Sequence, residues 1–183
     1  LWEIENEIRP NVPMVYYHVW DNYPYPNYNR YFYLSNDVIV TISRVTEDIV
    51  KNVAPEVKSH HLPHVINTDV FKRYPEEENK NFRLQSFPNE RNTDKMLFFW
   101  NNRNARRKQS GSLIYWFKAF LDKVGHDKAA LVMHTDTKDP NGQDLDAIIY
   151  ELGLIHGQVV FSKEKYPSDV LARMYNMADC TIN

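Results

Sequence analysis

The second half of the chain alternates short apolar runs with longer amphipathic stretches, and this alternation constrains the fold more than any other feature. The apolar runs cover residues 95–100, 129–133, 159–161 and 179–182. Between them, apolar side chains recur every three or four positions over residues 112–124, 145–152 and 168–177. The runs are predicted strands and the stretches are predicted helices. Strands that alternate with helices in this way form parallel sheets covered by helices. We therefore predict an α/β protein built from doubly wound parallel sheets.

The first part of the chain shows a shorter version of the same pattern. Residues 12–20, 37–42 and 58–66 read as extended segments, and Ser43 is the predicted N-cap of a helix that runs to Val53. Residues 74–92 are polar and only weakly periodic. We predict the end of an N-terminal Rossmann-like domain over residues 1–72, a linker over residues 73–94, and the first part of a C-terminal Rossmann-like domain over residues 95–183.

Composition and charge exclude several classes of protein. Apolar residues make up 43% of the chain, but no run of them reaches the roughly 20 residues that a membrane-spanning helix needs. This excludes a transmembrane segment and leaves peripheral membrane contact open. The net charge of −2 gives no general attraction for nucleic acid, so nucleic-acid binding is not expected. Cys180 is the only cysteine, which fits a reducing compartment, and we expect a cytoplasmic protein.

A cluster of cations follows the predicted strand over residues 95–100. Ligands of open α/β sheets gather beyond the carboxyl ends of the strands, and the start of the next helix adds amide donors and a positive dipole end. Phosphate is the ligand that suits such a place. The alternative is a solvated surface whose cations pair with carboxylates. The cations are Arg103, Arg106, Arg107 and Lys108.

Two histidines close predicted strands. His18 lies at the end of the first strand, ahead of a loop rich in tyrosine, and His134 directly follows the strand over residues 129–133. A histidine in this place can donate a hydrogen bond to a phosphate or a sugar hydroxyl, or act as an acid or base near neutral pH. A structural role is the alternative for both.

No metal site is predicted. His60, His61 and His64 lie on or beside one predicted strand, where successive side chains alternate between its faces, and no cysteine is near them. Asp144 and Asp146 form an Asp-x-Asp pair, but they stand at a helix start, where the helix dipole explains acidic residues. We expect no cofactor either, other than a co-substrate.

Four segments from Phe98 onward form a recognisable succession: Phe98-Phe99-Trp100-Asn101-Asn102-Arg103, Arg107-Lys108, Leu113-Ile114 and Ala119-Phe120. Together they resemble the start of the C-terminal domain in family 4 (group 1) glycosyltransferases, which have the two-domain GT-B fold. In that family, an arginine and a lysine grip the diphosphate of the sugar-nucleotide donor. The resemblance implies this role for Arg103 and Lys108, with Arg107 adding positive charge beside them. Asn102 stands where the family has glycine.

Later and earlier segments extend the resemblance. Residues 159–162 and 171–180 are similar to a family segment whose strand-ending loop contacts the nucleotide base, which implies that Phe161, Ser162 and Lys163 contact the base. Residues 63–71 resemble the signature ahead of the family's interdomain hinge. His18 falls near a histidine that faces the donor in many members, which implies a catalytic role.

The resemblance also shows what this chain does not contain. The family's Gly-rich N-terminal loop and its Glu-x7-Glu segment are not found here, so we expect an internal fragment that is inactive alone. The predicted activity is sugar transfer from a nucleotide-diphosphate sugar to an unknown acceptor (glycan, lipid or protein), with retention and without a metal. The alternative is a non-catalytic module that binds nucleotide or phosphate. Single-stranded nucleic acid is a weaker candidate, because the chain is acidic.

Overall fold

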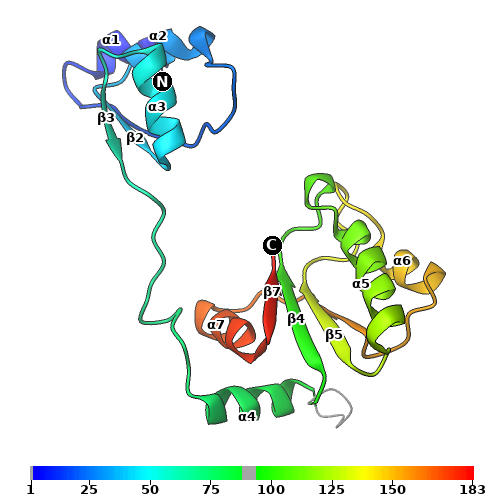
Figure 1. The fold of residues 1–183 in the computed structure, drawn as a ribbon. Helices are drawn as coiled ribbons and strands as arrows, with labels where there is room; N and C mark the ends of the chain where they lie inside the picture. The colour runs from blue at the N-terminus through cyan, green and yellow to red at the C-terminus, as the bar shows by residue number, and fades with distance from the viewer. Residues whose placement is uncertain (1, 88–93) are drawn as a thin grey trace. The chain divides into compact units, whose positions relative to one another are not determined.

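The computed structural model describes residues 2–87 and 94–183, and the chain divides into two compact units over residues 1–66 and 67–183 (Figure 1). Each unit has its own parallel sheet with helices packed against it. The predicted fold class is therefore confirmed. The boundary between the units falls at residue 66, ahead of the predicted linker.

The first unit contains a three-stranded parallel sheet in the order β1-β2-β3. Helix α3 begins as the sequence predicts, because the Ser43 hydroxyl accepts a hydrogen bond from the Thr46 amide at 3.1 Å. Ile39 and Ile49 are fully buried in the core that α3 covers. The elements are α1 (Glu5–Ile8), β1 (Val15–His18), α2 (Arg30–Leu34), β2 (Val38–Thr41), α3 (Arg44–Val53) and β3 (Lys58–His61), with 3-10 turns at Trp2–Ile4 and Asn27–Asn29.

The second unit contains a four-stranded parallel sheet in the order β6-β5-β4-β7. Gly125, at a φ of 110°, ends α5 as the sequence predicts. Helix α5 begins at Ser110, two residues before the predicted start. The elements are α4 (Glu76–Ser86), β4 (Met96–Asn101), the 3-10 helix η4 (Arg106–Lys108), α5 (Ser110–Val124), β5 (Ala129–His134), α6 (Leu145–Glu151), β6 (Val159–Ser162), α7 (Ser168–Met177) and β7 (Cys180–Ile182).

Successive side chains of the second sheet enter two different cores. Leu131 and Met133 of β5 pack in the core on the side of α5 and α6, and Val132 packs in the core on the side of α7. Both faces of β5 are therefore buried, which explains its continuous apolar run. Figure 1 shows α5 and α7 on opposite sides of this sheet.

Helix α4 lies within residues 73–94, where the sequence predicts a linker. It packs against α7, with Phe82 contributing to the core and Arg83 donating to Asp179 at 3.0 Å. Asn176 ties the preceding residues to α7, since it accepts from the Tyr74 amide at 2.8 Å and donates to the Lys72 carbonyl at 2.9 Å. The structure differs from the prediction here because packing on α7 supports a helix of weak amphipathicity. Residues 88–93 of the predicted linker lie outside the described residues.

Candidate functional site

The carboxyl ends of β4, β5 and β6 meet at one edge of the second sheet, where three polar side chains stand in a row. Asn101 pairs in register with His134, and His134 pairs with Ser162. Residues paired in register on parallel strands point to the same face, here the face of α7. We call these three residues the polar row. The row and the loops beside it form the candidate site, because ligands of open α/β sheets bind at this edge.

Arg103, in the loop after β4, is held by a carboxylate of the loop after β5. Its Nε and Nη2 lie 2.5 Å and 3.1 Å from the two carboxylate oxygens of Asp139. The Arg103 hydrogen bonds lower the pKa of Asp139 to about 2, and the same contact raises the pKa of Arg103. The charge of Arg103 is therefore already balanced by a carboxylate, whereas the resemblance implies a contact with phosphate.

The other cations of this loop form the short 3-10 helix η4, directly before α5. Within the described parts of the chain, no carboxylate pairs with Arg106, Arg107 or Lys108. Gln109 follows with a φ of 50°, in the left-handed region, and turns the chain into α5. The positive charge available to an anion thus lies on η4.

Asn104 fixes this basic loop to the loop after β5. It is fully buried, and its Nδ2 donates to the Gln143 carbonyl at 2.7 Å. Its Oδ1 accepts from the Ser110 hydroxyl and from the Gln143 amide. The Gln143 side chain in turn accepts from the Gly111 amide at 2.9 Å, so one free amide of the α5 start is already satisfied. A Cβ at Gly142 would lie 2.0 Å from the Asn104 carbonyl oxygen, which explains the glycine there.

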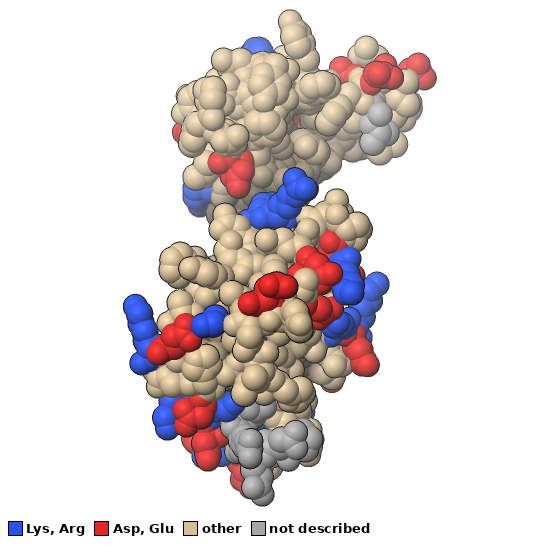
Figure 2. All heavy atoms as spheres, turned by 90° about the vertical axis from the view of Figure 1, so that its right-hand side faces the viewer, with Lys and Arg blue, Asp and Glu red and all other residues tan. Residues whose placement is uncertain are grey.

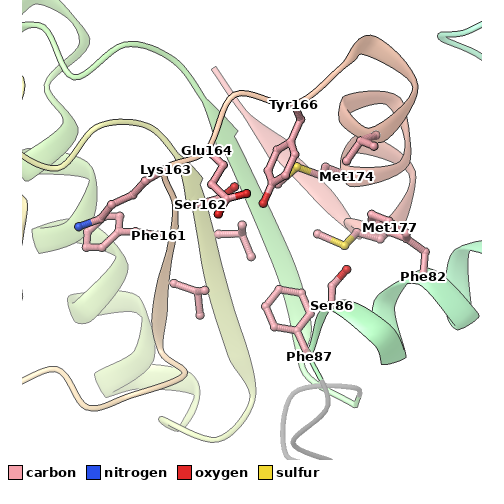
Figure 3. A pocket seen from close by; sticks show the side chains of 13 residues that line it. Phe82, Ser86, Phe87, Phe161, Ser162, Lys163, Glu164, Tyr166, Met174 and Met177 are labelled. Atoms are coloured by element: carbon pink, nitrogen blue, oxygen red, sulfur yellow. The ribbon is translucent and has the colours of Figure 1, made fainter.

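The three residues that the resemblance assigns to the base do not point the same way. Phe161 lies with the core on the α5 and α6 side, whereas Ser162 belongs to the polar row on the α7 side. The Lys163 Nζ lies 5.8 Å from the centre of the Phe161 ring and 3.6 Å from the Asp146 Oδ2. Figure 3 shows Phe161 and Lys163 together, away from Tyr166. A contact of all three with one base stays a prediction, to which main-chain atoms can contribute.

A cavity of about 550 Å³ opens between the second sheet and helices α4 and α7 (Figure 3). Its walls are mostly apolar, and its polar side chains come from α4 and from the end of β6 and the loop that follows. Such a cavity is in the size range of small-molecule sites. The apolar lining residues are Phe82, Phe87, Val132, Val160, Phe161, Val170, Met174 and Met177, and the polar ones are Ser86, Ser162, Lys163, Glu164 and Tyr166.

His134 is the centre of the polar row, and its role could not be assigned from the sequence. Its Nδ1 lies 2.9 Å from the Ser162 hydroxyl, and its ring stacks on Tyr166 at 5.5 Å between centroids. Burial lowers the pKa of His134, so the ring is neutral at pH 7. The position of His134 at the end of a predicted strand was one signal for this site. The partnership with Ser162 and Tyr166 depends on strand register, which the sequence does not state.

His18 lies in the core of the first unit. Only 4% of its surface is exposed, and its Nε2 lies 2.8 Å from the Tyr33 hydroxyl. Its Nδ1 has no hydrogen-bond partner among the described residues. Burial lowers the pKa of this histidine, so its ring is neutral at pH 7. These contacts serve the packing of the first unit, and a catalytic role for His18 stays a prediction.

Charges on the second unit are mixed in sign. In the view of Figure 2, acidic and basic side chains of this unit lie next to one another.

Among the described residues, no three histidine, cysteine or carboxylate side chains gather as a metal site would require. None of the helices in the described ranges has the length and apolar character to cross a membrane.

Comparison with known proteins places the fold. No protein-family model and no curated protein matches the sequence, whereas solved structures match over nearly the whole chain. A trehalose 6-phosphate synthase from Burkholderia multivorans aligns with 99% of this chain at 13% identity and a TM-score of 0.68. HepE from Anabaena, in complex with UDP and glucose, aligns with 92% at 12% identity and a TM-score of 0.65. The sucrose-phosphate synthase of Thermosynechococcus elongatus aligns with 98% at 15% identity and a TM-score of 0.62.

These neighbours are glycosyltransferases of the GT-B type, and at such low identity they show the fold of this chain alone. The chain has the α/β fold of their Rossmann-like domains. It spans about half of their length, with 48% of the trehalose 6-phosphate synthase, 45% of HepE and 47% of the sucrose-phosphate synthase covered.

Proposed function

We propose that this chain is part of a glycosyltransferase that transfers a sugar from a nucleotide-diphosphate sugar to an acceptor. The observation that carries the proposal is the match of 99% of the chain, and so of residues from both units, with a GT-B glycosyltransferase. One neighbour is described in complex with UDP and glucose and again with UDP-glucose, which supports a nucleotide sugar as the donor. The acceptor, a glycan, lipid or protein, is not proposed more narrowly.

Two features of the second unit support a placement of the donor. The cations of η4 follow β4, and the cavity opens beside the end of β6. These strands are two positions apart in the sheet, a separation of about 10 Å at the usual strand spacing. An extended nucleoside diphosphate covers a comparable length. We propose that the diphosphate binds at η4 and that the base binds near the end of β6.

Three cations have roles in this proposal. Arg107 and Lys108 would contact the diphosphate directly, because no carboxylate among the described residues competes for them. Arg103 would join them after exchanging one oxygen of Asp139 for a phosphate oxygen. As the sugar leaves, negative charge grows on the diphosphate, and fixed cations stabilise that charge.

The family 4 resemblance supports a finer proposal. Transfer would retain the configuration of the sugar, and the cations of the basic loop would take the place of a metal ion. No cofactor other than the donor sugar nucleotide is required in this scheme. We also propose a cytoplasmic location, which fits a donor of this kind.

The test is calorimetric titration of the chain with nucleoside diphosphates, nucleotide sugars and inorganic phosphate. We expect the double variant R107A/K108A to lose at least about tenfold in diphosphate affinity, since each cation contributes a charge-assisted bond. The matched control K118A/K123A removes the same charge from α5, away from η4, and should change affinity less than twofold. Equal binding of phosphate and nucleotide would favour the non-catalytic module instead. Absence of any nucleotide binding by the folded chain would refute the donor site.

A further inference from the structure

We propose that the donor base of this chain is guanine and that Glu164 selects it. The inference rests on the proposed function, because it concerns the base end of the same donor site. It names the chemical class of the donor, a guanosine-diphosphate sugar, which neither the fold nor the comparisons decide. The cavity beside β6 has a carboxylate in its wall, and this pair of features points to the base.

The cavity suits a flat heterocycle. At about 550 Å³ it is far larger than the gaps that remain in a well-packed core. Phe82 lies beside Met177, and Phe87 lines another part of the wall, as Figure 3 shows. Aromatic and thioether groups make favourable contacts with the face of a base. The walls are therefore fit for the ring itself, and selectivity must come from the polar groups.

Tyr166 forms a fixed part of the cavity. Its ring stacks on His134, and the His134 Nδ1 is bonded to the Ser162 hydroxyl. In Figure 3 the Tyr166 hydroxyl points into the cavity. This chain of contacts ties the loop after β6 to the end of β5. Glu164 lies in this loop, two residues before Tyr166, whose side chain is held by these contacts.

Glu164 is an exposed carboxylate in the lining of the cavity, next to Lys163, which also belongs to the lining. Figure 3 shows its carboxylate directed inward, whereas the neighbouring Lys163 points to Phe161 and lies 3.6 Å from Asp146. Within the described ranges, no cation pairs with Glu164. A carboxylate only accepts hydrogen bonds. The base that fits it must present donors.

Guanine presents donors in the required geometry. Its N1–H and its N2 amino group lie side by side and can bond both oxygens of one carboxylate. Uracil presents a single N–H between two carbonyl oxygens, and these would repel the second carboxylate oxygen. Adenine and cytosine present one amino group beside a ring acceptor. A paired, charge-assisted contact with Glu164 is therefore available to guanine and to none of the other three bases.

Titration of the chain with GDP, UDP, ADP and CDP tests the inference. We expect GDP to bind at least about tenfold more tightly than UDP, as a paired base contact provides. E164Q should reduce this preference severalfold, because an amide loses the charge and matches the N–H and carbonyl pair of uracil as well. E151Q, a change of the same kind on the α6 surface, should leave the preference unchanged.

The possible outcomes distinguish a failure of the guanine assignment from a failure of the proposed glycosyltransferase function. UDP binding as tightly as GDP would overturn the assignment of guanine and leave the proposed transferase in place. A GDP preference that persists in E164Q would overturn the role of Glu164. No binding of any of the four nucleotides would overturn the inference and the proposed function together. Where nucleotides do bind, R107A/K108A tests the diphosphate end by itself, because it should weaken all four equally, whereas E164Q should change only the preference among them.

Discussion

Asn104 joins the two loops on which the proposed diphosphate site depends, and its removal should be costly. In N104A, the Gln143 carbonyl, the Gln143 amide and the Ser110 hydroxyl each lose a partner. Asn104 is 0% exposed and Ser110 is 1% exposed, so water does not readily replace these bonds. Each bond contributes about 1 kcal/mol net, and an unsatisfied buried group costs at least as much. We expect the second unit to lose about 3 kcal/mol of unfolding free energy.

Amide hydrogen exchange of β5 measures this loss, because the buried amides of that strand report the opening of the second unit alone. The melting temperature of the unit should fall by about 10 °C, at roughly 3–4 °C per kcal/mol for a domain of this size. N102A is the matched control, since the side chain of Asn102 makes one exposed bond of 3.4 Å to Asn183. A single ordinary hydrogen bond contributes about 1 kcal/mol. A loss smaller than that in N104A would refute the claim that three hydrogen bonds of Asn104 stabilise the second unit.

Three further predictions follow from the same structure. D139N should tighten pyrophosphate binding severalfold in calorimetry, because it releases Arg103 and removes a negative charge; unchanged affinity would show that Arg103 does not reach the anion. The pKa values of His18 and His134 are lowered in the folded state, so below pH about 6.5 these two side chains take up protons in the unfolded state first. The free energy of unfolding should therefore be at its full value above that pH and should fall as the pH drops below it. Urea denaturation from pH 7.5 to 5.5 checks this, and a flat profile would contradict it. G153A should cost about 1 kcal/mol in the same assay, because residue 153 has a φ of 65°; no cost would mean that the turn relaxes.

The strands and most helices were predictable because their signals are local. An apolar run bounded by turn residues marks β5, and Gly125 marks the end of α5. Ser43 marks the start of α3 by its own hydrogen bond. Helix α4 was not predictable in this way. Its sequence is strongly polar, and its stability comes from α7, whose residues lie about 90 positions later in the chain.

The candidate site was predictable only in part, for a related reason. The basic loop is a local cluster of residues, so the sequence shows it. The pairing of Arg103 with Asp139 spans 36 positions, and the contact of His134 with Ser162 spans 28. Both depend on which strands are neighbours and in what register. A sequence pattern states neither, so the balance of charge at Arg103 and the position of the cavity became visible only in the structure.

Charge is distributed along the candidate site with opposite signs at its two ends. The cations of η4 follow β4, and the Glu164 carboxylate stands two strands away, beyond β6. Two cation clusters would suit an anion that is charged throughout, such as a polyphosphate. One cationic and one anionic end suits a ligand with phosphates at one end and hydrogen-bond donors at the other. A guanosine diphosphate has this polarity, whereas uracil turns two acceptors toward the carboxylate. The arrangement of charge therefore favours a particular class of nucleotide even though the net charge of the chain is nearly zero.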